Sequence, residues 1–269
     1  MEVGDRIKQL CSPFNNSDNI LVAFSGGVDS TFLLYVLKMF SSAKVSAVTI
    51  KTPYIPVWEI EEALKFCKEM DIEHEIIDIP IHRSVLLNPP DRCYRCKSIL
   101  FGHIKKYAEA KGFNIIADGS NADDSKDYRP GMKALKELSI RSPLLEAGFT
   151  KEEIRKHLRD FKLDIWDKPA YACLLTRIPY NTKITINDLR LIEESERFLH
   201  LMGFPGARVR LHKNIARLEI NSGFFNKILE DDVRESIIKE FKKRGIEYIS
   251  LDLEGYRTGS MNHKKTRII

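Results

Sequence analysis

The stretch Ile20-Leu-Val-Ala-Phe-Ser-Gly-Gly-Val-Asp-Ser30, continued by Thr31-Phe-Leu-Leu-Tyr-Val-Leu-Lys38, decides the fold of this chain. Its first residues are mostly apolar or β-branched, as in a strand buried inside a parallel sheet. The apolar spacing after Ser30 is typical of a helix. Residues 25–30 are therefore expected to form a turn between a strand and a helix.

This turn has the chemistry of a phosphate-binding loop. Gly26 and Gly27 carry no side chain, so a ligand can approach the backbone, and glycine permits positive φ angles. The following helix directs free N–H groups and the positive end of its dipole at the same place. The Walker A motif GxxxxGK[ST] is excluded, because the loop has no lysine. The alternative is a Gly-Gly turn that opens an ordinary helix.

Ser25-Gly-Gly-Val-Asp-Ser30 resembles the pyrophosphate loop of the PP-loop ATP pyrophosphatases. These enzymes split ATP between the α and β phosphates, usually to adenylate a substrate oxygen that a nucleophile then displaces. The resemblance implies ATP and Mg²⁺ as cofactors and a catalytic role for Asp29. It also implies that the pyrophosphate end of ATP is bound by Ser25, Gly26, Gly27, Asp29 and Ser30.

The composition is that of a globular protein. The 269 residues are 43% hydrophobic and 30% charged, and this length suits one large domain with a smaller one. No apolar run approaches the ~20 residues of a membrane span, and residues 1–5 do not resemble a signal peptide. We therefore expect a cytoplasmic protein with no membrane partner. The net charge of +5 suits a phosphorylated ligand and is too small by itself to indicate nucleic acid.

Strands and helices alternate through the first 120 residues. The pattern predicts strands from residue 20 and at 44–50, 73–79 and 114–118, with helices after Ser30 and at 57–70 and 94–110. This order predicts an α/β fold with a doubly wound parallel sheet. Ligands of such sheets bind beyond the carboxyl ends of the strands, where Asp118-Gly119 also falls. Gly119 is therefore a further candidate for cofactor binding.

The pattern changes in the second half of the chain. Thr150 and Glu153 have the spacing of a capping box for a helix at 150–161. A segment rich in proline and polar residues then predicts a linker. Beyond it we expect an α+β unit, with helices at 187–202 and 224–244 and strands at 207–211, 215–220 and 247–253. The predicted division is a PP-loop domain at 1–166, a linker at 167–185 and an α+β substrate-binding domain at 186–269.

Five cysteines without an export signal indicate metal or thiol chemistry more than disulfides. Cys93 and Cys96 open a predicted helix three residues apart, so both can face one metal, and the helix dipole favours thiolates. Cys173 lies in the predicted linker. Three thiolates without an obvious fourth ligand suit a [4Fe-4S] cluster with one open iron. A structural zinc and a redox dithiol remain alternatives, and Cys11 and Cys67 are expected to be ordinary thiols.

A basic group marks the predicted small domain. Arg208 and Arg210 alternate on a strand, so both face one side, and Arg257 lies in a glycine-containing loop. Paired arginines with a loop arginine can form a fork-like phosphate site. The alternative is a solvated strand face held by salt bridges, in which Glu219 on the neighbouring strand takes part.

The chain as a whole resembles the LarE family, the ATP-dependent sulfur-insertion enzymes of nickel-pincer nucleotide synthesis. The resemblance runs from Ser25 nearly to Asn262, through Ser25–Ser30, Asp118-Gly119, Asp127-Tyr-Arg-Pro-Gly131, Arg177-Ile-Pro-Tyr180, Gly203-Phe-Pro205, Arg208-Val-Arg-Leu-His212, Ile215-Ala-Arg-Leu-Glu219 and Leu251-Asp-Leu253. It implies a pyridinium dicarboxylate mononucleotide as substrate. ATP would adenylate a ring carboxylate, and sulfur would displace AMP to leave a thiocarboxylate.

The same resemblance implies roles for the small domain. Arg208, Arg210 and Arg257 would bind the phosphate of the mononucleotide. Glu196 and Glu219 match acidic positions of the family and would orient these arginines or bind a metal. We also expect a homo-oligomer.

The cysteines depart from the best-known branch of the family. There, a single cysteine five residues before the arginine that matches Arg177 gives up its own sulfur, whereas this chain has Ala172 at that position and Cys173 next to it. The three-cysteine pattern of Cys93, Cys96 and Cys173 is similar to a branch understood to hold a [4Fe-4S] cluster with an extra sulfide. The resemblance thus implies a catalytic sulfur carrier that needs sulfide or another sulfur donor. The alternative is a PP-loop tRNA thiolase, which should have a more basic surface and further zinc-type CxxC pairs.

Overall fold

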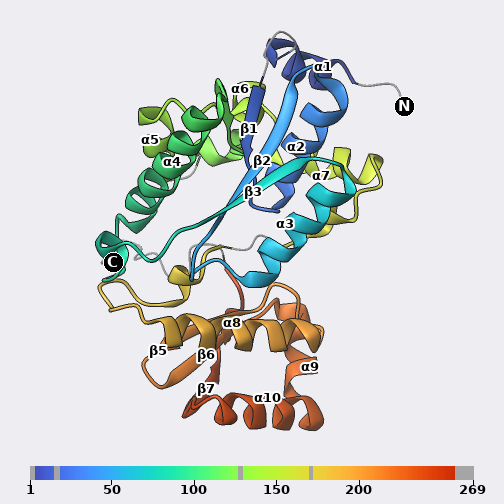
Figure 1. Ribbon diagram of the computed structural model, residues 1–269. Coiled ribbons are helices and arrows are strands. Elements are labelled where there is room, and N and C mark those ends of the chain that lie inside the picture. The colour runs from blue at the N-terminus through green and yellow to red at the C-terminus, as the bar shows by residue number, and fades with distance from the viewer. Residues whose placement is uncertain (1–3, 15–18, 127–129, 170–171, 258–269) are drawn as a thin grey trace, which may run out of the picture. The chain divides into compact units, whose positions relative to one another are not determined.

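The computed structural model in Figure 1 describes residues 4–14, 19–126, 130–169 and 172–257. It divides into two compact units. The first consists of residues up to 85 together with 91–170, and the second of residues 86–90 together with the chain from 171 onward. Residues 127–129 of the stretch Asp127–Gly131 lie outside the described part.

The first unit is built on a four-stranded sheet in which all strands are parallel, in the order β3-β2-β1-β4. The strands are β1 (Asn19–Ala23), β2 (Lys44–Lys51), β3 (Glu73–Asp78) and β4 (Ile115–Ala117). The middle residues of β1 and β2 are buried, as their apolar runs predict. The expected α/β fold with a parallel sheet is confirmed.

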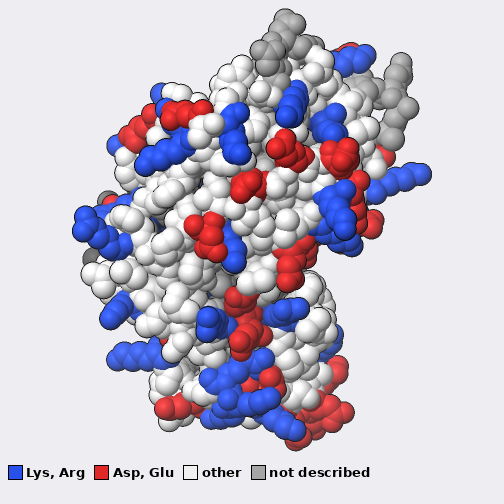
Figure 2. All heavy atoms as spheres, in the orientation of Figure 1, with Lys and Arg blue, Asp and Glu red and all other residues white. Residues whose placement is uncertain are grey.

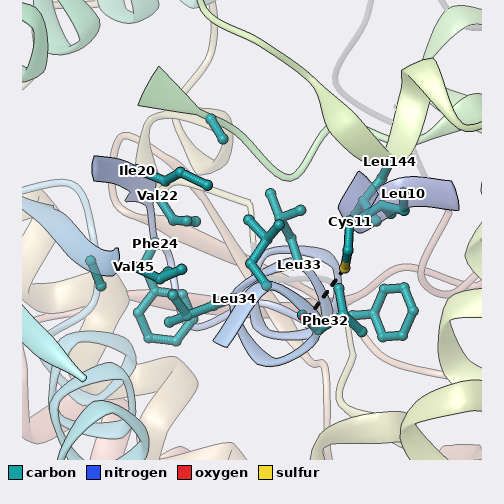
Figure 3. Packing of buried hydrophobic residues seen from close by; sticks show 14 of the residues in the cluster. Leu10, Cys11, Ile20, Val22, Phe24, Phe32, Leu33, Leu34, Val45 and Leu144 are labelled. Carbon is teal, nitrogen blue, oxygen red and sulfur yellow. Dashed lines mark hydrogen bonds between the residues drawn. The ribbon is translucent and has the colours of Figure 1, made fainter. Parts of the chain in front are cut away.

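Helices cover both faces of this sheet. They are α1 (Asp5–Cys11), α2 (Val28–Phe40), α3 (Val57–Glu69), α4 (Arg92–Lys111), α5 (Pro130–Glu137), α6 (Pro143–Glu146) and α7 (Lys151–Asp160). Alternate residues of β1 point to opposite faces. Ile20 and Val22 pack into the core formed with α1, α2, α3 and α7 (Figure 3), whereas Leu21 packs against Ile104 and Ala108 of α4.

The strand order creates a switch point beside β1. The chain runs from β1 outward to β2 and β3, and then returns to place β4 on the other side of β1. Ligands in open parallel sheets bind at such a point, outside the carboxyl ends of the strands. The loop after β1 and the loop after β4 therefore both lie where a ligand is expected.

The second unit contains a three-stranded sheet in the order β5-β6-β7. β5 (Arg208–His212) pairs antiparallel with β6 (Ile215–Glu219), and β6 pairs parallel with β7 (Tyr248–Leu251). The helices are α8 (Ile186–Leu201), α9 (Phe225–Leu229) and α10 (Asp231–Lys243). Val209, Ala216 and Leu218 face the core shared with these helices.

Two local details differ from the sequence-based expectations, and a third agrees with them. The helix after the glycine loop begins at Val28, so Asp29 and Ser30 belong to its first turn. The helix expected at 224–244 is divided into two, because Glu230 has extended backbone angles (φ −57°, ψ 137°). The expected capping box of Thr150 and Glu153 is confirmed at the start of α7.

The segment whose composition indicates a linker contains buried residues. Its 3-10 helix η5 (Leu174–Arg177) buries the side chains of Leu174, Leu175 and Arg177. The buried Asn88 amide donates hydrogen bonds to the carbonyls of Leu175, Ile178 and Pro179 at 3.2, 2.8 and 3.1 Å. Here a side-chain donor binds backbone carbonyls of a segment that belongs to no sheet or α-helix. Proline and polar residues are therefore compatible with burial in this segment.

Within the described residues, no helix has the length and apolar character needed to cross a bilayer.

Candidate functional site

The glycine loop leaves β1 and enters α2 through a residue with left-handed backbone angles. Gly26 has a φ of +67°, in the left-handed region that favours glycine. A Cβ atom at this position would also lie 3.2 Å from both the Ala63 Cβ and the Glu59 carbonyl oxygen. Both the backbone angle and the close packing against α3 therefore favour glycine here.

Two serine hydroxyls fix the shape of the loop. The Ser25 and Ser30 Oγ atoms lie 3.1 Å apart, and the Ser30 hydroxyl donates to the carbonyl of Gly27 at 3.2 Å. The Gly27 N–H donates to the Ser25 Oγ at 3.4 Å. Gly27 is the N-cap of α2, and its cap has no side-chain hydrogen bond. An uncapped helix N-terminus beside an exposed Ser25 is suited to an anion.

The loop after β4 lies directly on the first turn of α2. A Cβ atom on Gly119 would be 2.8 Å from the Ser30 backbone nitrogen and 2.9 Å from its Cα. Glycine at 119 thus allows the close approach of two backbones. The neighbouring Asp118 is buried, and its carboxylate accepts hydrogen bonds from Ser142 and Ser120 at 2.5 and 2.6 Å. The structure brings the two predicted loops together.

Two lysines missed by the sequence analysis contact this loop. The Lys151 Nζ donates to the Asp29 Oδ2 at 2.5 Å, and the Lys168 Nζ donates to the Gly26 carbonyl at 2.8 Å. Lys168 also pairs with the Glu62 carboxylate. The lysines lie more than a hundred residues along the chain from their loop partners, so local patterns do not reveal them. The sequence contained one indication of such residues: the loop itself has no lysine, so any lysine that contacts it must come from another part of the chain.

Cys93 and Cys96 are the second and fifth residues of α4. Cys93 is exposed, Cys96 is half-buried, and the Tyr54 hydroxyl is 3.2 Å from the Cys96 Sγ. Cys173 is half-buried and immediately precedes η5 in the second unit. Across the described ranges, no three His, Cys, Asp or Glu side chains are gathered as a metal site requires.

The other two cysteines have a different environment. Cys11 and Cys67 are buried in the core of the first unit, and the Cys11 thiol contacts the Val36 carbonyl at 3.5 Å (Figure 3). Burial raises the pKa of Cys11 to about 11 and that of Cys67 to about 12. Both remain protonated thiols at neutral pH, which does not suit a metal ligand.

The polar face of the second sheet is buried. Arg208 and Arg210 are only 2% and 4% exposed, so the alternative of a solvated face is wrong. Arg210 pairs with Glu219 at 2.7 Å, and Arg217 bridges Glu219 and Asp252 at 3.2 and 2.6 Å. Arg210, Glu219, Arg217 and Asp252 therefore form a connected network of charges, buried at Arg210 and Glu219 and half-buried at Arg217 and Asp252.

Arg208, on the same face, contacts an aromatic ring and backbone carbonyls. Its guanidinium lies 5.2 Å from the centre of the Tyr256 ring, and it donates to the carbonyls of Gly206 and Ala207. Burial is the main cause that lowers the Arg208 pKa, followed by the charge of Arg177. The position is unfavourable for an isolated cation and becomes more favourable when an anion is present.

Glu196 connects a second arginine to the same sheet. Its carboxylate accepts a bidentate pair of hydrogen bonds from Arg177 at 2.8 and 2.9 Å, and a third from the Val209 N–H at 2.9 Å. The Nη1 atom of Arg177 donates to the carbonyls of Ala172 and Cys173 at 2.6 and 3.2 Å. Arg177, which the sequence analysis did not assign to the site, thus holds the backbone of Cys173.

Arg257 is exposed and makes a hydrogen bond to Glu254 at 2.7 Å. It is the one predicted phosphate-binding arginine whose side chain is open to solvent. On the face of the molecule shown in Figure 2, positive and negative side chains are interspersed.

Three comparisons with known proteins bear on this site. The family model of the queuosine biosynthesis protein QueC matches residues 19–89, which include the glycine loop. An uncharacterized protein of Synechocystis sp. is 35% identical, over 97% of this chain and 98% of its own length. The pyridinium-3,5-bisthiocarboxylic acid mononucleotide synthase of Lactiplantibacillus plantarum is 31% identical, over 96% of this chain and 94% of its own.

The chain belongs to the LarE family. A tRNA-specific 2-thiouridylase MnmA of Rickettsia massiliae is also similar, at 27% identity over 71% of this chain and 63% of its own length. The LarE-type synthase is thus matched from end to end, whereas the thiouridylase is matched in part. Both relatives have names that refer to a thiolated product, a bisthiocarboxylic acid mononucleotide and 2-thiouridine.

Proposed function

We propose that the chain is an ATP-dependent sulfur transferase of nickel-pincer nucleotide synthesis. It adenylates a carboxylate of a pyridinium dicarboxylate mononucleotide and then exchanges AMP for sulfur, which gives a thiocarboxylate. The observation that carries this proposal is the Ser25–Ser30 loop at the switch point of the sheet, with Gly119 packed on its helix. The similarity to the LarE-type synthase over 96% of the chain supports the choice of substrate.

The first step is adenylation. A carboxylate oxygen of the substrate attacks the α phosphorus of ATP, the bond to the bridging oxygen breaks, and pyrophosphate leaves with the bonding electrons. The Ser25 and Ser30 hydroxyls and the start of α2 are suited to bind that pyrophosphate. Orientation and charge stabilisation are the main contributions a protein can make to such a transfer.

Asp29 is suited to hold Mg²⁺ next to the pyrophosphate. Its Oδ1 atom is buried and has no hydrogen-bond partner among the described residues, while its Oδ2 accepts from Lys151. An unsatisfied carboxylate oxygen is a ligand that Mg²⁺ prefers. The fit of this donor supports Mg²⁺–ATP as the form that the loop binds.

The buried arginine network supports the substrate site. Arg208 and Arg210 would bind the phosphate of the mononucleotide together with the exposed Arg257. Glu219 and Glu196 keep guanidinium groups in place through ion pairs. Pre-positioned guanidiniums bind phosphate through charge-assisted hydrogen bonds.

The three accessible cysteines would hold a [4Fe-4S] cluster. As soft thiols near the start of α4, Cys93 and Cys96 suit two of the ligands, and Cys173 would be the third. When bound, such a cluster supplies one iron without a protein thiolate, where sulfide from a donor could be held. In the exchange itself, sulfur attacks the acyl carbon of the adenylate and AMP leaves with the oxygen.

The second candidate is a tRNA thiolase, which the partial similarity to MnmA supports. The two candidates share ATP cleavage and sulfur transfer and differ in the acceptor. Binding of bulk tRNA compared with binding of the pyridinium mononucleotide separates them.

The proposal is tested by anaerobic incubation of the protein with ATP, Mg²⁺, sulfide and the mononucleotide. We expect AMP, pyrophosphate and thiocarboxylate in equal amounts, and no product from Asp29→Ala with an unchanged circular dichroism spectrum. Release of ADP and inorganic phosphate would contradict the assigned cleavage. Thiolated tRNA in place of thiocarboxylate would support the second candidate.

A further inference from the structure

We propose that His74 and Thr49 are positioning residues for the glycine loop, because together they fix the backbone carbonyl of Phe24, the residue directly before Ser25. This inference rests on the proposed function, since it takes the loop to be the part that binds the pyrophosphate of ATP. Neither residue belongs to the loop. Thr49 lies on β2 and His74 lies on β3.

The first argument is a continuous chain of hydrogen bonds across the sheet. The Thr49 Oγ1 donates to the Phe24 carbonyl at 2.6 Å, and it lies 2.7 Å from the His74 Nε2. A carbonyl oxygen only accepts, and a hydroxyl has a single proton to donate. The Thr49 proton therefore goes to Phe24, and the His74 Nε2 donates its own proton to the Thr49 oxygen. The chain runs from β3 through β2 to the residue that follows β1.

The second argument concerns the other nitrogen of the imidazole. The His74 Nδ1 atom is buried and has no hydrogen-bond partner among the described residues. The ring stands edge-on to the Phe24 ring, with 6.0 Å between centres and 69° between planes. Burial is the main cause that lowers the His74 pKa, so the ring is neutral at neutral pH. The imidazole thus contacts Phe24 directly by packing and indirectly through Thr49.

The third argument is that the peptide between Phe24 and Ser25 is held at both of its polar atoms. Its carbonyl accepts from Thr49, and its N–H donates to the Ser30 Oγ at 3.3 Å. The same Ser30 Oγ lies 3.1 Å from the Ser25 Oγ. The orientation of this one peptide therefore sets the positions of both hydroxyls that are suited to bind pyrophosphate.

The functional consequence is preorganisation of the loop. Donors stabilise an anion most when they are already in place and need no rearrangement on binding. Without the bond from Thr49, the Phe24 carbonyl is free to rotate, and the Ser25 N–H rotates with it. Without the bond from His74, the Thr49 hydroxyl loses the donor that fixes its orientation.

A second hydrogen bond between β2 and β3 provides a matched control. The Ser46 Oγ donates to the Glu73 Oε2 at 3.4 Å, and these two residues are the first register pair of the two strands. Ser46 is buried, as Thr49 is. The pair joins the same strands at the end opposite to the glycine loop, so its loss reports what a merely structural contact contributes.

The test measures the binding of inorganic pyrophosphate with Mg²⁺ by calorimetry in the full-length protein, together with the thermal midpoint. Thr49→Val and His74→Phe keep the approximate shape of each side chain and remove its donor. Each should weaken binding by about fivefold. Thr49→Ser and His74→Gln, which supply a donor again, should bind within about twofold of the unmodified protein. Ser46→Ala should leave the affinity unchanged.

A double variant tests whether His74 acts through Thr49. Thr49→Val combined with His74→Phe should bind pyrophosphate about as well as Thr49→Val alone, because the second change removes a bond that is already lost. Losses that add in the double variant would overturn the relay.

Other results would also overturn the inference. Unchanged pyrophosphate affinity in both Thr49→Val and His74→Phe would show that the Phe24 carbonyl does not control the loop. Equal losses in Thr49→Ser and His74→Gln, in step with lower thermal midpoints, would show that these side chains only stabilise the sheet. If the unmodified protein binds pyrophosphate but releases ADP from ATP, the proposed function fails whatever these variants do. If it binds no pyrophosphate, both fail.

Discussion

The Asn88 side chain donates a hydrogen bond to the backbone carbonyl of Leu175 at 3.2 Å. The same side-chain amide donates to the carbonyls of Ile178 and Pro179, and the backbone carbonyl of Asn88 accepts from the Asn181 N–H at 3.1 Å. One fully buried side chain therefore organises the segment that follows Cys173. It also fixes the start of the chain that leads to Cys93.

We expect Asn88→Ala to lower the free energy of unfolding by about 1–3 kcal/mol, because buried carbonyls lose their donor. The variant should also bind less iron after anaerobic reconstitution. Urea denaturation and iron analysis measure the two effects. Asn226→Ala, at an exposed position of α9, is the control, and equal stability of the two variants would contradict the prediction.

Arg257→Ala should raise the Michaelis constant for the mononucleotide by about tenfold, because one charged hydrogen-bond partner is lost. Its thermal unfolding midpoint should not change, since Arg257 is exposed. Arg210→Ala should affect both quantities, because the Glu219 carboxylate is fully buried and would lose one of its guanidinium partners. Steady-state kinetics and thermal melts separate the two arginines. An unchanged Michaelis constant in both variants would show that neither Arg210 nor Arg257 binds the substrate.

Cys93→Ala, Cys96→Ala and Cys173→Ala should each abolish thiolation and reduce iron content, while adenylation persists. Cys11→Ala and Cys67→Ala should retain the iron, because those thiols are buried and remain protonated. Anaerobic absorption and EPR spectra, together with iron content, report the cluster. Intact mass after turnover should show Cys173 unchanged. Loss of its sulfur would show that the protein sacrifices its own cysteine.

The free energy of unfolding should fall as the pH is lowered through about 6.5, the ordinary histidine pKa. Burial lowers the pKa of His74, His157 and His212 in the folded protein. The unfolded chain therefore binds more protons in this window, so acid favours unfolding.

His157→Phe is the variant that isolates this effect. His157 stacks on Phe32 at 5.7 Å between ring centres, so phenylalanine preserves the packing and removes the titration. Urea denaturation at about pH 8 and about pH 5.5 should show a smaller difference in this variant than in the unmodified protein. The same difference in both proteins would contradict the prediction. His103→Gln, at an exposed position of α4, is the control.

The sequence by itself determined the elements that depend on neighbouring residues. The buried run of β1, the glycine turn and the first turn of α2 lie within about a dozen consecutive positions, so their pattern is readable directly. The capping box of α7 is equally local. Alternation along β5 correctly placed Arg208 and Arg210 on one face.

Only the tertiary structure decided what surrounds those residues. Arg210 is buried beside Glu219 of β6 and Arg208 beside the Tyr256 ring, and a strand pattern does not reveal which face is covered. Lys151 reaches Asp29, and Lys168 reaches Gly26, because the packing of α2 and α7 in one core joins distant parts of the chain. Asn88 organises the segment after Cys173 for the same reason. Contacts between residues far apart in sequence follow from the packing of the core as a whole, which local periodicity does not encode.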